Sequence, residues 1–114
     1  MDTEIADDFI NFVKKIDPNA EVENLTVRSL DAIREFLIFV STTGVFSGLW
    51  TLFQAWRSHK RVADVQVEYF TDNQVRVQIN YANRTLHEVE EIIRSHPPKK
   101  GGSAKVSILT DKHK

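Results

Sequence analysis

The sequence predicts an α+β domain in which helices cover one face of a small antiparallel sheet. Apolar residues recur at helical spacing near the N-terminus and again over residues 86–95, whereas apolar and polar residues alternate over residues 64–81. Residues 36–56 form a run without any charged side chain. With 114 residues and 41% hydrophobic content, the chain is expected to form a single domain, 1–114, with a modest core.

The first predicted element is an amphipathic helix over residues 3–16. Its apolar residues are spaced three and four apart: Ile5, Phe9, Phe12, Val13 and Ile16. Pro18 ends this helix, because the residue before a proline avoids helical backbone angles. Residues 19–28 fit either an extended stretch or a short turn of helix, and the pattern leaves both open.

A second helix is expected over residues 29–41, where Leu30, Ile33, Leu37 and Val40 form one apolar stripe. Four poor helix formers follow, Ser41, Thr42, Thr43 and Gly44, so the chain could break there. A third helix would then cover residues 44–58. From the sequence alone, the run 36–56 is either one helix or two.

Residues 64–70 and 74–81 predict a β-hairpin around the turn residues Thr71, Asp72 and Asn73. One face of this hairpin is apolar and the other polar, so helices should cover the sheet on one side only. Thr85 and Glu88 have the spacing of a capping box and predict a helix over residues 86–95. Residues 97–104 have the composition of a flexible linker, after which residues 105–110 could return as a third strand.

Composition argues against several kinds of chemistry. The chain has no cysteine, which excludes a disulfide, a thiol nucleophile and a thiolate metal site, and which fits the cytoplasm. The histidines, His59, His87, His96 and His113, lack the spacing of a metal motif. We therefore expect no catalytic residue, no bound metal and no cofactor. A pI near 6.4 also argues against a dedicated nucleic-acid-binding domain.

The uncharged run 36–56 has two interpretations. It is long enough to cross a bilayer, and the basic residues that follow would hold that end in the cytoplasm, as in an inner-membrane protein with a cytoplasmic C-terminal head. However, hydroxyl and amide side chains and two glycines lower its hydropathy, and the apolar face of the hairpin needs a helix to cover it. We favour helices buried inside the domain or lying at an interface over a membrane span.

The order of elements resembles the effector-associated constant component family. The resemblance lies in Asp31 and its helix, the small-residue break Ser41 to Gly44, the apolar helix ending at residues 55–60, and the strand 64–67. It covers about residues 25–94. The break of this chain is poorer in glycine and alanine than the family pattern, and its apolar helix is more aromatic. The resemblance implies a small α+β module without catalytic activity that brings effectors and sensors together in bacterial conflict and defence systems.

We therefore expect a noncatalytic protein–protein interaction or assembly module that binds a protein partner or self-associates. The surplus of large apolar residues in and around the run 36–56 suggests an interface. The candidate interface residues are Phe39, Gly44, Phe46, Gly48, Trp50, Phe53 and Trp56, flanked by the basic residues Arg57, Lys60 and Arg61. The two glycines could let another helix approach closely, although packing inside the domain is the more ordinary explanation.

Overall fold

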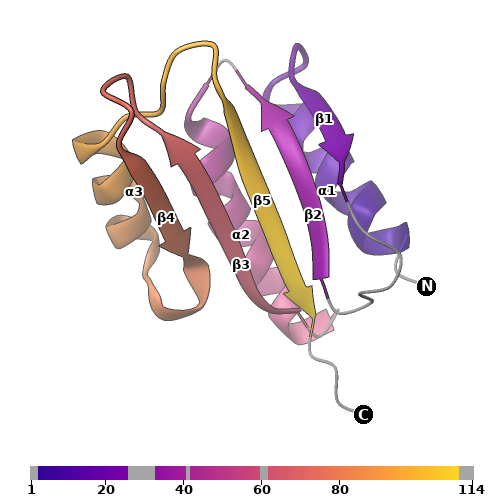
Figure 1. The fold of residues 1–114 in the computed structure, drawn as a ribbon. Coiled ribbons are helices and arrows are strands. Elements are labelled where there is room, and N and C mark those ends of the chain that lie inside the picture. The colour runs from indigo at the N-terminus through magenta and orange to yellow at the C-terminus, as the bar shows by residue number, and fades with distance from the viewer. Residues whose placement is uncertain (1–2, 26–32, 41, 60–61, 111–114) are drawn as a thin grey trace.

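The computed structural model describes residues 3–25, 33–40, 42–59 and 62–110. Within these residues, three α-helices pack against one face of a five-stranded antiparallel sheet, and the other face of the sheet carries no helix (Figure 1). The elements are α1 (Thr3–Ile16), β1 (Glu21–Asn24), β2 (Ile33–Phe39), α2 (Gly44–His59), β3 (Val62–Phe70), β4 (Arg76–Asn80), the short 3-10 helix η1 (Tyr81–Asn83), α3 (Leu86–Ser95) and β5 (Ser103–Thr110). The predicted α+β class is confirmed.

The strand order is β1-β2-β5-β3-β4, so the last strand of the chain lies at the centre of the sheet. Because β5 is antiparallel to both neighbours, β2 and β3 run parallel to each other, with α2 connecting them across the helical face. Because β3 is antiparallel to both β4 and β5, these two strands run parallel to each other on either side of it, and α3 connects them. The central strand β5 therefore joins the pair β1–β2 to the pair β3–β4, and the five-stranded sheet forms only when β5 pairs with both β2 and β3.

The core lies between the helices and the sheet face that they cover. Alternate residues of each strand point into it, for example Phe36 and Ile38 of β2, which oppose Val106 and Ala104 of β5. The apolar stripe of α1 packs on these strands, and the ring of Phe9 lies 4.6 Å from that of Phe36 between centroids. Burying a large apolar side chain contributes roughly 1.5–3 kcal/mol, so this layer is the main source of stability.

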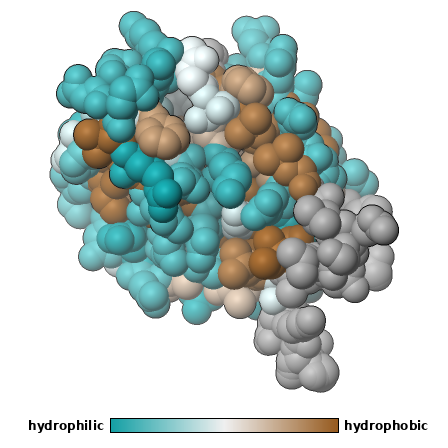
Figure 2. Space-filling view, in the orientation of Figure 1, coloured by the Kyte–Doolittle hydropathy of each residue, from teal (hydrophilic) through white to brown (hydrophobic). Residues whose placement is uncertain are grey.

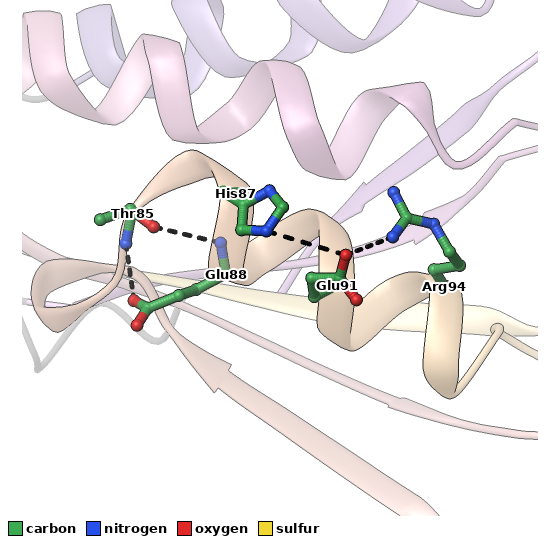
Figure 3. A network of polar contacts seen from close by, with 5 residues as sticks. All are labelled: Thr85, His87, Glu88, Glu91 and Arg94. Atoms are coloured by element: carbon green, nitrogen blue, oxygen red, sulfur yellow. Dashed lines mark hydrogen bonds and ion pairs between the residues drawn. The ribbon is translucent and has the colours of Figure 1, made fainter.

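Helix α3 has the predicted bounds and the predicted capping box (Figure 3). The Glu88 backbone N–H donates to the Thr85 hydroxyl at 3.1 Å, and the Thr85 backbone N–H donates to the Glu88 carboxylate at 2.9 Å. On the exposed side, the Glu91 carboxylate pairs with Arg94 one turn later and lies 3.8 Å from the His87 ring. The capping bonds satisfy two backbone N–H groups at the start of α3, and its charged side chains lie in solvent. The apolar side of α3 therefore faces the core.

The prediction of a helix over residues 29–41 is wrong in the part that the structure describes, because residues 33–39 form strand β2. All seven residues of β2 pair with β5, from Ile33 opposite Leu109 to Phe39 opposite Ser103. The helical stripe seen in the sequence also fits a strand that is half-buried on both faces, and the long-range pairing decides between them. Residues 29–32 and 41 lie outside the described residues.

Other boundaries differ by a few residues. The stretch left open at 19–28 contains β1, which pairs with β2 at the edge of the sheet. The second strand of the hairpin begins at Arg76 rather than at residue 74, because Gln74 has a positive φ of 67° and belongs to the turn. The expected strand 105–110 starts two residues earlier, at Ser103, which shortens the expected linker 97–104.

The uncharged run 36–56 is neither one helix nor two. It begins in β2 and, after a turn, continues in α2, and both elements contribute side chains to the core. Among the described residues, none of the helices combines the length and the apolar character that crossing a bilayer requires.

Candidate functional site

Three of the expected interface residues belong to the core. The side chains of Phe46, Phe53 and Trp56 lie on the face of α2 that packs on the sheet, with at most 2% of their surface exposed. The Phe46 ring stacks on that of Tyr69, with 5.8 Å between centroids. In the folded chain these three side chains have almost no surface to offer a partner, and their role is to hold α2 on the sheet.

Two further candidates also make contacts within the domain. A methyl group added at Gly48 would lie 2.9 Å from the δ-methyl of Ile16 and 3.0 Å from the ring of Phe12, so this glycine allows α1 to approach α2 closely. The indole N–H of Trp50 donates to the Arg84 carbonyl oxygen at 2.8 Å and ties α2 to the loop before α3.

The basic flank starts at the far end of α2. Arg57 is exposed, and its guanidinium lies 5.3 Å from the centre of the Phe53 ring. Lys60 and Arg61, the rest of this flank, lie outside the described residues.

The remaining candidates, Phe39 and Gly44, lie at the same end of the sheet, where β2 ends and α2 begins. We call this the loop end: β2 and β3 finish here, β4 and β5 begin here, and the connection from α3 to β5 crosses here (Figure 1). Phe39 is the last residue of β2 and is 39% exposed. Gly44 opens α2, and its backbone N–H donates to the Thr42 hydroxyl at 3.2 Å.

A cleft of about 630 Å³ opens at the loop end. It lies where β2 and β5 diverge beyond their last pair, Phe39 opposite Ser103. Its floor includes Ile38, Phe46 and Ala104, which are core residues, so the cleft reaches down to the hydrophobic layer between α2 and the sheet.

A turn that carries two lysines forms one wall of the cleft. The Gly102 backbone N–H donates to the Lys99 carbonyl oxygen at 3.0 Å, and Gly101 has a φ of +74°, the geometry of a turn that favours glycine at its third position. The Lys99 backbone N–H donates to the Phe70 carbonyl oxygen at 2.8 Å, which fastens this turn to the end of β3. Lys99 and Lys100 are exposed at the rim and make no ion pair with any described residue.

The loop end also gathers the exposed apolar surface. Among the described residues, four large apolar side chains are exposed: Ile16 (38%), Phe39 (39%), Phe70 (46%) and Val75 (51%). Each ends or begins an element at the loop end, namely α1, β2, β3 and the turn before β4. In Figure 2, which views the open face of the sheet, brown apolar patches interrupt a largely hydrophilic surface. Beside Phe70, Arg76 forms an ion pair with Glu68 at 2.9 Å.

Sequence reasoning missed most of this surface. Phe70 follows the buried Tyr69 and therefore lies on the polar face of the hairpin, which was a usable signal for an exposed aromatic residue. Ile16 and Val75 were assigned to apolar faces that helices should cover. Lys99 and Lys100 were assigned to a linker, and nothing in the sequence places that linker beside Phe39.

Two titratable side chains, the phenols of Tyr69 and Tyr81, lie buried in the domain. Among the described residues no three histidine, aspartate or glutamate side chains lie close enough to hold a metal ion. Burial raises the pKa of Tyr69 to about 12 and raises that of Tyr81 still further. Both phenols donate to backbone carbonyls, Tyr69 to His96 and Tyr81 to Phe46, each at 2.7 Å, and so connect elements of the fold.

Comparisons with protein-family models, curated proteins and solved structures found no match to this chain.

Proposed function

We propose that the chain is a noncatalytic protein-binding module and that its loop end is the interface. The observation that carries this proposal is the gathering of Ile16, Phe39, Phe70 and Val75 at one end of the domain. Phe70 and Val75 flank one turn, in which the Thr71 backbone N–H donates to the Val75 carbonyl oxygen, and exposed apolar side chains that lie close together on a small domain commonly mark a protein contact. Large apolar side chains, with charged residues at the margin, are the composition of a small interface.

The finer proposal, that this module acts as an adaptor in a bacterial conflict or defence system, rests on the resemblance to the effector-associated constant component family. Its support is the small-residue break, the apolar helix and the strand that follows, because the expected first helix is strand β2 in the described residues. In such an adaptor, affinity comes from a surface and not from a reaction centre. A side chain that projects from the end of a strand suits this role, because the paired strand holds it in place before the partner arrives.

The test removes apolar surface without touching the core. Phe70→Ser combined with Val75→Ser should leave the fold intact, because both side chains are about half exposed. The matched control is Gln78→Ser, an exposed position on the neighbouring strand β4. Partner capture is measured by co-purification, self-association by light scattering at several concentrations, and folding by circular dichroism.

We expect the double variant to lose the captured partner or the self-association of the wild-type chain, while the control keeps both. If the double variant is folded and neither property changes, the loop end is not the interface and the proposal is wrong.

A further inference from the structure

The cleft at the loop end has the dimensions of a binding site. Its volume of about 630 Å³ falls within the roughly 300–1,000 Å³ that is typical of ligand pockets. Phe39 and Pro97 give it exposed apolar lining above a floor of core residues, whereas its rim carries Lys99, Lys100 and, on the opposite wall, Glu21. An occupant must therefore combine an apolar group with a charged one.

The charges at the rim select the sign of the occupant. Lys99 and Lys100 have no ion-pair partner among the described residues, and the first turn of α2 carries no acidic side chain. Glu21 is the cross-strand partner of Phe39 and would repel a second carboxylate. An acidic group is therefore favoured on the wall formed by the 99–102 turn and disfavoured on the β1 wall. This difference sets the orientation in which an occupant binds.

The surroundings of the cleft favour a polypeptide as the occupant. The opening is continuous with Phe39, and the lysine turn is bonded to the end of β3 that carries Phe70. An occupant whose apolar group enters the cleft therefore lies beside exposed apolar surface that a small molecule would leave uncovered.

We propose that the cleft binds a short acidic segment of a partner protein, with an apolar side chain seated against Phe39, which lines the cleft and is 39% exposed, and one or more carboxylates beside Lys99 and Lys100. This inference rests on the proposed function and names the chemistry of its partner. The segment enters with its acidic residue toward the 99–102 turn and away from Glu21.

The experiment selects peptides from a library of random dodecapeptides displayed on phage, with the whole chain as the immobilised target. Enriched peptides are labelled, and their affinity is measured by fluorescence anisotropy. Lys99→Gln with Lys100→Gln removes the two charges at the cleft. Arg84→Gln is the control, because it removes a positive charge at an exposed position away from the loop end.

We expect enrichment of peptides that carry an aromatic or aliphatic residue close to aspartate or glutamate. The double lysine variant should weaken binding about two- to thirtyfold, the range for two solvent-exposed ion pairs, and the arginine control should not. Binding of the wild-type chain should weaken as salt is raised, and Glu21→Gln should strengthen it.

Three results would overturn the inference: no enrichment, enrichment without acidic residues, or affinities that the lysine variant leaves unchanged. These outcomes separate it from the proposed function. If the Phe70 and Val75 double variant still abolishes partner capture, the loop end remains the interface and only the acidic segment in the cleft is refuted. If that variant has no effect either, both proposals fail.

Discussion

Replacing each glycine of α2 by alanine tests whether the pair serves internal packing or contact between chains. A methyl group at Gly48 would lie 2.9–3.1 Å from atoms of Ile16 and Phe12, whereas one at Gly44 would meet its nearest neighbours at 3.6 and 4.0 Å. Carbon atoms attract best at about 3.5–4.0 Å. The new methyl group is therefore crowded at Gly48 and comfortable at Gly44.

The size of the effect follows from two opposing terms. Gly→Ala in a helix gains at most about 1 kcal/mol from helix propensity, and overpacking costs about 1–3 kcal/mol. The propensity gain acts in the same direction in both variants, so the difference between them mainly reports the crowding. The crowded atoms are the ends of the Ile16 and Phe12 side chains, and Ile16 is partly exposed and can shift. We therefore expect Gly48→Ala to be less stable than Gly44→Ala by about 1 kcal/mol, the low end of the range for overpacking.

Urea denaturation followed by circular dichroism measures the free energy of unfolding of both variants, and light scattering reports their assembly state. A Gly48→Ala variant at least as stable as Gly44→Ala would refute the close packing of α1 on α2. Unchanged stability with an altered assembly state would instead assign Gly48 to a contact between chains.

Three further predictions concern the polar contacts of the fold. Tyr81→Phe removes a buried hydrogen bond to the Phe46 carbonyl oxygen and should lower the free energy of unfolding by about 0.5–1.5 kcal/mol, which urea denaturation measures; an unchanged midpoint would contradict this. Because burial raises the pKa of both Tyr69 and Tyr81 in the folded chain, the folded state keeps protons that the unfolded state loses above a pH of about 10. Stability should therefore be unaffected by these groups below that pH and fall as pH rises through about 12; alkaline titration of the midpoint checks the sign, and Tyr81→Phe should flatten the fall. Thr85→Ala removes the cap of α3 and should cost about 1 kcal/mol; thermal denaturation measures the loss, and an unchanged transition would mean that the cap does not contribute.

Local signals predicted most of the elements correctly. The bounds of α1 and α3 match the residues expected from apolar spacing and from the Thr85 cap, because in both segments the helical period and the end signals agree. The hairpin was also expected, since alternation and turn residues are local properties. Helix α2 was expected to within one residue for the same reason.

The prediction failed where pairing partners are distant in sequence. The segment Ile33–Phe39 was predicted to be helical because the spacing of its apolar residues fits both the helical period and the alternation of a strand. The segment forms a strand because β5, more than 60 residues later, supplies a partner for each of its residues. No local pattern contains that information.

The candidate site divides in the same way. Phe39 and Gly44 were named from the sequence as parts of an apolar run, and the structure places them at the loop end. The sequence did not show that Lys99 and Phe70 lie at the same end as Phe39 and Gly44. The hydrogen bond from the Lys99 backbone N–H to the Phe70 carbonyl oxygen, and the position of β5 between β2 and β3, arise only on folding.

The sequence by itself determined the α+β class, the ends of two helices and the side of the sheet that helices cover, because apolar periodicity and capping act over a few residues. Only the tertiary structure decided that residues 33–39 form a strand, that most of the aromatic run lies in the core, and that a cleft opens at the loop end. These features depend on contacts between residues far apart in the chain, where the burial available to each side chain is set by the packing of the whole domain.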